Sequence, residues 1–100
     1  MKPAKRRWSK TYEAAEEELL RFLEAKNLHP QRIDMSEFEE RTESASSASI
    51  ELWCAEGSAE CKINGTSYAL QAGDYLYVPI GSGLTCSAGF SGCVLYQKTD

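Results

Sequence analysis

Histidine is scarce in this sequence, which has His29 as its only imidazole in 100 residues. A histidine-rich mononuclear metal centre needs two or three imidazoles beside a carboxylate, so one histidine is too few. A Ser-His-Asp or Cys-His catalytic set is also disfavoured, because His29 lies beside Pro30 in a separate segment and is interpreted as a turn or surface residue. A serine or cysteine activated in another way stays open. We therefore expect no metal ion and no cofactor.

Long apolar runs and an excess of positive charge are absent too. No stretch approaches the roughly 20 apolar residues that span a bilayer, and residues 1–10 lack the apolar centre of a signal peptide. We expect a cytoplasmic protein without membrane contact. The net charge of −4 disfavours nucleic-acid binding as the main activity. A basic cluster near the N-terminus is interpreted as a solvated arm: Lys2, Lys5, Arg6, Arg7 and Lys10.

One amphipathic helix is predicted from about Ser9 to Asn27, with Ser9 as its N-cap. Its apolar stripe would pack on the rest of the domain or on a partner subunit. The stripe consists of Tyr12, Ala15, Leu19, Phe22 and Leu23, opposite Glu13, Glu17 and Glu24. We expect one structural domain, with the basic arm and helix at residues 1–29 and a β-barrel at residues 30–100.

Three hairpins are predicted after Pro30. Asn64-Gly65 is typical of a type I′ turn, which would pair Ile63 with Thr66 and Cys61 with Tyr68. Turns at residues 56–59 and 88–91 would bring together two further pairs, Cys54 with Cys61 and Cys86 with Cys93. Residues 41–49, rich in Ser and Ala, fit either a loop or a strand.

The four cysteines leave three interpretations open. Reduced, buried thiols that act as small hydrophobic side chains are favoured for a cytosolic protein. Disulfides stay possible because directly opposed strand positions are close enough for a bridge. A four-thiolate zinc site is the third reading, although neither pair has the usual short spacing between ligands.

Residues 53–83, WCAEGSAECKINGTSYALQAGDYLYVPIGSG, resemble the core of a small cupin, and the resemblance extends over about residues 42–97. Gly73, Pro79 and Gly81 occupy the backbone positions of the second cupin motif, but Leu84 stands at its histidine and Ala88 at its asparagine. In the first motif Ile50 stands at the glutamate, and the two histidines fall among residues 43–46. The resemblance implies a mainly β fold, a small cupin or jelly-roll β-barrel with one N-terminal amphipathic helix and degenerate metal motifs.

The cupin alignment also predicts which side chains face inward, because metal ligands must point into the barrel. The interior would then be apolar with a serine rim, either open to a ligand or filled by side chains, with filling favoured. The opposite parity places Glu51, Trp53, Tyr75 and Tyr77 outside, beneath the helix or a second subunit. The candidate ligand-binding residues are Ser44, Ser46, Ile50, Leu52, Tyr68, Leu84 and Cys86.

The favoured function is a metal-free cupin-fold binding or sensory module for a small molecule or a protein partner, forming a homodimer. No catalytic residue is assigned. One alternative is a metal-independent relative of sugar isomerases or epimerases, with acid-base or orienting work done by Ser44, Ser46, Tyr68 or Tyr96. The other alternative is a structural dimerisation subunit.

Overall fold

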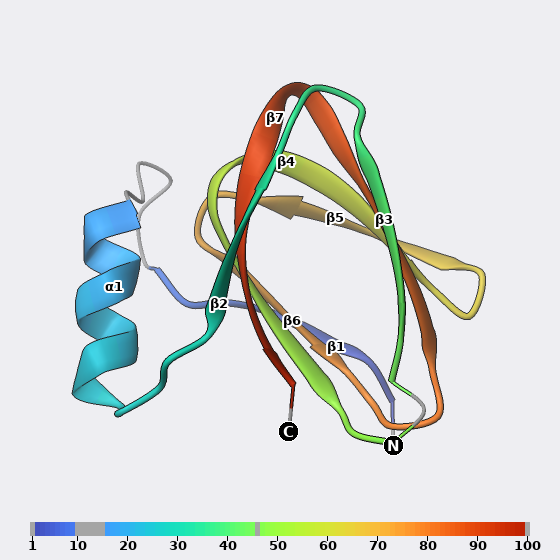
Figure 1. The fold of residues 1–100 in the computed structure, drawn as a ribbon, viewed down its shortest axis with the longest axis horizontal. Coiled ribbons are helices and arrows are strands. Elements are labelled where there is room, and N and C mark those ends of the chain that lie inside the picture. The colour runs from blue at the N-terminus through green and yellow to red at the C-terminus, as the bar shows by residue number, and fades with distance from the viewer. Residues whose placement is uncertain (1, 10–15, 46, 100) are drawn as a thin grey trace.

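The computed structural model describes residues 2–9, 16–45 and 47–99. Within these residues one helix and seven strands follow one another, and the strands form a single antiparallel sheet (Figure 1). The predicted mainly β fold with one N-terminal helix is confirmed. The elements are β1 (Ala4–Arg7), α1 (Glu16–Ala25), β2 (Gln31–Met35), β3 (Glu40–Ser44), β4 (Ile50–Ile63), β5 (Thr66–Gln71), β6 (Asp74–Val78) and β7 (Gly83–Thr99).

Two long strands, β4 and β7, organise the sheet. The main strand order is β1-β6-β4-β7-β2, while β5 pairs with the second half of β4 and β3 with the first half of β7. The pairing of β4 with β7 shifts register on either side of Glu56-Gly57, where both strands bend. The bends fold the sheet into two layers that share these strands (Figure 1).

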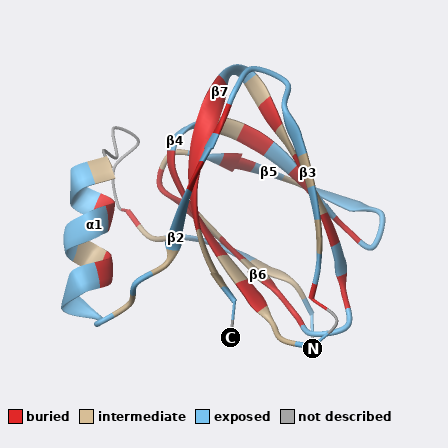
Figure 2. Cartoon of the chain, viewed as in Figure 1, coloured by how far each residue is buried: buried red, intermediate tan, exposed pale blue. Residues whose placement is uncertain are grey.

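The main core lies between the two layers. Figure 2 shows buried positions alternating along the strands, as expected where one face of each strand points inward. Ile50, Leu52, Leu70, Leu76 and Val78 are all at most 1% exposed. A second, smaller cluster lies between α1 and the outer face of the sheet and contains Leu19, Leu23, Trp53, Ala55, Val94 and Tyr96.

Helix α1 covers the outer face, as its predicted stripe requires. Its described part begins at Glu16 and not at Ser9, whose backbone N–H donates to the Gly73 carbonyl (3.3 Å). The predicted stripe positions Tyr12 and Ala15, together with Glu13, lie outside the described residues. The predicted end is confirmed, since Asn27 has a φ of 57° that α-helix cannot continue. In the part of the chain that the structure describes, no helix has the length and apolar character needed to cross a bilayer.

Of the three predicted hairpins, the one at Asn64-Gly65 is confirmed. Both residues have positive φ angles, 51° and 89°, as a type I′ turn requires. Ile63 pairs with Thr66 in the predicted register. The predicted turns at residues 56–59 and 88–91 are wrong, because β4 and β7 continue through them as bent strands.

The N-terminal arm pairs with the sheet, while its basic side chains Lys5, Arg6 and Arg7 are exposed, as the sequence interpretation expects. Residues of β1 pair with β6, and the Arg7 guanidinium donates to the buried Asp74 carboxylate at 2.9 Å. Asp74 also accepts a hydrogen bond from the backbone N–H of Gln71 (2.9 Å) and lies 3.7 Å from the Lys5 amine. This carboxylate therefore joins the arm to the turn before β6, while Lys10 lies outside the described residues.

Candidate functional site

The barrel interior holds most of the side chains predicted to bind a ligand. Ile50, Leu52, Leu84 and Cys86 are at most 4% exposed and belong to one packed core cluster. Tyr68 is half-buried and packs against the same cluster. Their inward direction is confirmed, and they fill the space between the layers with one another and with neighbouring side chains. Their role in ligand binding stays a prediction.

The predicted serine rim is not found where it can be checked. Ser44 is exposed and lies on the outer face of β3, whereas Ser46 lies outside the described residues. The register explains the difference for Ser44. Glu43 is paired with the inward-facing Leu84, and directly paired residues share a face of the sheet. The alignment placed β3 one residue out of step, which exchanges its two faces.

Polar side chains from β3 therefore point toward the interior. Arg41 and Glu43 form an ion pair at 2.5 Å, and the Gln97 amide donates to the other Glu43 carboxylate oxygen at 2.5 Å. Sequence reasoning missed this cluster. The available signal was the alternation of Arg41 and Glu43 in β3. The cupin alignment assigned this face of β3 to the outside.

The residues at the cupin metal positions do not fit a metal ion. Ile50 and Leu84 carry only carbon atoms in their side chains, and the Glu43 carboxylate is engaged by Arg41 and Gln97. His29 is exposed between α1 and β2. Across residues 2–9, 16–45 and 47–99, no group of three or more His, Cys, Asp or Glu side chains could hold a metal ion.

The cysteines are paired differently from the prediction. Because β4 and β7 do not turn back, Cys61 lies opposite Cys86, and Cys93 lies opposite Gly57. All four thiols are free and buried. Burial raises the pKa of Cys54 to about 12 and that of Cys93 to about 11, so both are protonated at neutral pH.

Tyr96, a candidate for acid-base work in the alternative enzyme, lies under α1 on the outer face. Its hydroxyl donates to the Glu16 carboxylate at 2.5 Å, and the same oxygen accepts from Arg32 at 2.6 Å. Burial and then the Glu16 hydrogen bond raise the pKa of Tyr96 to about 12. Tyr96 therefore links α1 to the sheet through this hydrogen bond and does not line the barrel.

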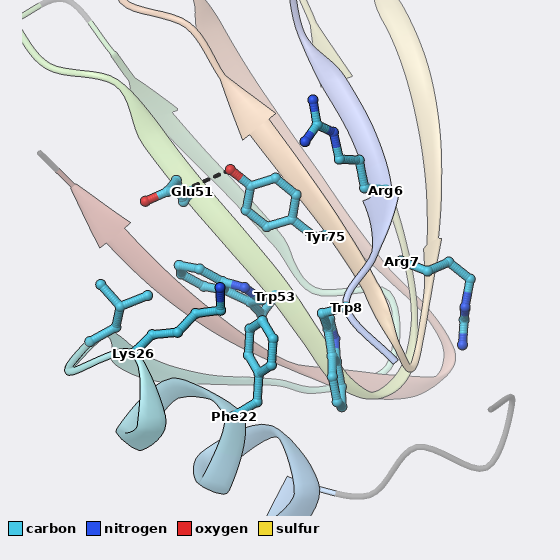
Figure 3. A pocket seen from close by; sticks show the side chains of 9 residues that line it. Arg6, Arg7, Trp8, Phe22, Lys26, Glu51, Trp53 and Tyr75 are labelled. Carbon is cyan, nitrogen blue, oxygen red and sulfur yellow. Dashed lines mark hydrogen bonds between the residues drawn. The ribbon is translucent and has the colours of Figure 1, made fainter. Parts of the chain in front are cut away.

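A groove of about 360 Å³ opens on the outer face of the sheet, between α1, the end of β1 and the outward side chains of β4 and β6 (Figure 3). Trp53 points outward from β4 and is paired with Tyr75 on β6, which puts both rings on one face. The predicted outward direction of these two aromatics is confirmed. The groove is lined by Arg6, Arg7, Trp8, Phe22, Lys26, Leu28, Glu51, Trp53 and Tyr75.

Aromatic rings form the walls of this groove. The Trp53 and Tyr75 ring centroids are 5.5 Å apart, and those of Trp8 and Phe22 are 6.3 Å apart. The Trp8 indole N–H donates to the Cys54 carbonyl (3.1 Å), which sets the position of this ring. Trp8 reaches the groove only because β1 pairs with β6, and no local pattern in the sequence predicts that pairing.

Cations stand at the rim. The Lys26 amine lies 5.1 Å from the Phe22 ring centroid, and Arg6 reaches across from β1 above Tyr75 (Figure 3). Among the described residues that line the groove, Glu51 alone is acidic; it accepts from the Tyr75 hydroxyl (2.7 Å) and lies 3.9 Å from the Lys98 amine. Burial first, and then the Glu51 hydrogen bond, raise the pKa of Tyr75.

No protein-family model matches the chain. No curated protein sequence is significantly similar to it. Solved structures do match. A DUF861 family protein from Thermotoga maritima aligns over 99% of this chain and 100% of its own, with 14% identity and a TM-score of 0.66.

Domains described as CENP-C and Cnp3 match as well. Drosophila melanogaster CENP-C bound to CAL1 aligns over 69% of this chain and 62% of its own, with 13% identity and a TM-score of 0.65. The Schizosaccharomyces pombe Cnp3 cupin domain aligns over 69% and 53%, with 19% identity and a TM-score of 0.62. This chain spans less than two thirds of those chains. Together with the bent, two-layered antiparallel sheet, these likenesses show that the chain has the cupin fold.

Proposed function

We propose that this protein is a metal-free binding module whose ligand lies in the outer groove, and that the ligand is a small planar molecule with a negative charge. The observation that carries the proposal is the contrast between the two candidate sites. Packed side chains occupy the interior of the barrel, while the groove offers about 360 Å³ of space beside the partly exposed rings of Trp8, Phe22 and Tyr75. That volume is at the lower end of the range for small-molecule sites, which suits a ligand of one or two rings.

The shape of the groove favours a flat apolar group. Trp53 is almost wholly buried and forms the base, while Trp8, which follows β1, and Phe22 on α1 lie beside it (Figure 3). Aromatic pairs prefer offset or edge-to-face contacts with centroids about 4.5–7 Å apart. The groove already uses such spacings between its own rings, and a ligand ring inserted among them would extend the same contacts.

The charge at the rim favours an anion. Arg6 and Lys26 reach the groove from opposite sides. The Glu51 carboxylate accepts a hydrogen bond from the Tyr75 hydroxyl, and its negative charge is paired with the nearby Lys98 amine. Arg7 is engaged by Asp74 and contributes less to a ligand. A carboxylate on an aromatic ring would place its charge toward Arg6 or Lys26 and its ring toward Trp53.

The test is a titration with aryl carboxylates followed by tryptophan fluorescence. The protein has two tryptophans, and both line the groove, so the signal reports directly on this site. Benzoate, phenylacetate and naphthoate are the probes, and the corresponding neutral amides control for charge. We expect saturable quenching by the acids and at least a several-fold weaker effect of the amides.

Arg6→Gln separates groove binding from a general charge effect. We expect this variant to weaken binding of the acids about tenfold, which corresponds to about 1.4 kcal/mol. Arg21→Gln is the matched control, because Arg21 is exposed on α1 and does not line the groove. Equal binding of acids and amides, or equal losses in the two variants, would show that the groove does not select an anion.

A protein partner is the second candidate, favoured by a different surface. Phe38 and Phe90 are 63% and 79% exposed, and their rings form an edge-to-face pair with centroids 6.1 Å apart. Two large exposed aromatic rings in contact are typical of an association surface. A structural neighbour, CENP-C, was solved bound to the protein CAL1. The homodimer expected from the sequence would use this surface and stays a prediction.

A further inference from the structure

Two of the buried thiols face each other across the central strand pair. Cys61 on β4 is the direct partner of Cys86 on β7, and both side chains point into the core between the layers. Their sulfur atoms are 2.8 Å apart. Directly paired antiparallel residues have Cα atoms about 4.5–5.5 Å apart, which lies within the range that a disulfide spans.

The other two thiols lack this arrangement. Cys93 is opposite Gly57, which has no side chain, and Cys54 is opposite Leu95. The Cys54 thiol donates to the Glu56 carbonyl at 3.6 Å. Cross-strand geometry therefore selects one pair among the four cysteines, and it is neither of the pairs that the predicted hairpins would have made.

We propose that Cys61 and Cys86 are a redox modification site, at which hydrogen peroxide converts the two thiols into a disulfide that links β4 to β7. The site is independent of the outer groove. Because both strands run through both layers, the bond would join the two longest strands of the sheet directly.

The reaction balances in two steps. The sulfur of one cysteine attacks peroxide, forming an S–O bond as the O–O bond breaks; the departing hydroxide takes up the thiol proton, which leaves a sulfenic acid and one water. The second thiol then attacks the sulfenic sulfur, the S–S bond forms, and oxygen leaves as a second water. The two sulfurs together lose two electrons, and peroxide is reduced to water.

Cys86 is the better first nucleophile. It is 4% exposed, whereas Cys61 is fully buried, and its cross-strand neighbour on β3 is the cationic Arg41. The hydrogen bond with Cys86 and then burial raise the pKa of Cys61, so this thiol is protonated at neutral pH. Peroxide is small enough to reach such a site, unlike a bulky disulfide oxidant.

The test counts free thiols after oxidation. Reduced protein is treated with peroxide, quenched with catalase, unfolded, and alkylated with N-ethylmaleimide before intact-mass analysis. Untreated protein carries four alkylated cysteines, and we expect two after oxidation, with a single crosslinked peptide containing Cys61 and Cys86. Oxidation should also raise the thermal unfolding midpoint, and dithiothreitol should reverse both changes.

Variants check the pairing. The double variant Cys54→Ser/Cys93→Ser should still form the bond, whereas Cys61→Ser and Cys86→Ser should each lose it. Peptide mapping of the wild-type protein keeps the test decisive if a serine variant fails to fold. Four alkylatable thiols after oxidation, a crosslink through Cys54 or Cys93, or conversion to sulfinic and sulfonic acids without a crosslink would overturn the proposal.

Discussion

Gly57 on β4 and Gly92 on β7 lie against each other where the two long strands bend. A Cβ atom built on Gly57 would lie 2.1 Å from the Gly92 carbonyl oxygen, and one on Gly92 would lie 2.5 Å from the Met35 carbonyl oxygen. Both glycines have positive φ angles, 71° and 75°. The sheet can fold into two layers because neither position carries a side chain.

Gly57→Ala should therefore destabilise the fold strongly. The substitution adds a left-handed backbone penalty to a clash with the Gly92 backbone, and we expect a loss of about 2 to 4 kcal/mol in the free energy of unfolding. Urea denaturation followed by circular dichroism measures it. Gly65→Ala is the matched control, because Gly65 has a φ of 89° but a Cβ added there would meet no described atom within 4 Å. The control should lose only about 1 to 2 kcal/mol, and equal losses would show that close approach of the strands is unimportant.

Asp74→Asn should loosen the N-terminal arm. The asparagine keeps an oxygen that accepts the Gln71 N–H but loses the charge that holds Arg7 and Lys5. We expect a loss of about 1 to 3 kcal/mol, since the carboxylate is buried and the Arg7 side chain is partly exposed. Hydrogen exchange should show faster exchange of the β1 amides in particular. Unchanged protection of β1 would mean that strand pairing alone holds the arm.

Glu16→Gln should make the stability of the protein less dependent on pH. The hydrogen bonds from Arg32 and then Tyr96 lower the pKa of Glu16 in the folded state. A lowered folded pKa contributes stability above the unfolded pKa, and this contribution is lost as the pH falls through the folded pKa. Denaturation series from pH 7 down to pH 3 should show the wild type more stable at neutral pH, with the difference shrinking on acidification.

The control for this titration is Glu17→Gln, on an exposed position of the same helix. It should leave the pH dependence as in the wild type. A difference between wild type and Glu16→Gln that stays constant over the whole pH range would contradict a role for the Glu16 charge.

Phe38→Ser/Phe90→Ser should change association and not folding. Both rings are exposed, so the thermal midpoint should move little, whereas a self-associating or partner-binding surface would be weakened. Sedimentation analysis over a range of concentrations measures the oligomeric state of both proteins. A wild type that stays monomeric at every concentration would contradict the predicted homodimer. A dimer that is unchanged in the variant would show that the interface lies elsewhere on the protein.

Local patterns in the sequence were sufficient for the elements whose causes are local. The spacing of Leu19, Phe22 and Leu23 predicted the helix and its buried side, and Asn64-Gly65 predicted a hairpin and its register, because both depend on neighbouring residues. The outward direction of Trp53 and Tyr75 came instead from the cupin alignment, which set the inward and outward faces of their strands. The cupin resemblance also placed Ile50 and Leu84, which are carbon-only side chains, at positions that a metal would need.

Tertiary structure decided what depends on contacts between distant segments. Because β7 pairs with β4 on both sides of Gly57, the chain bends at this glycine and does not turn back. Cys61 therefore lies opposite Cys86 and not opposite Cys54. The pairing of β3 with β7 decided which face Ser44 and Glu43 occupy, because a shift of one residue exchanges the faces of a strand. The pairing of β1 with β6 brought Arg6 and Trp8 to the outer groove, which no local pattern indicated. Local periodicity determines which side chains share a face, but only the partner strand determines what that face meets.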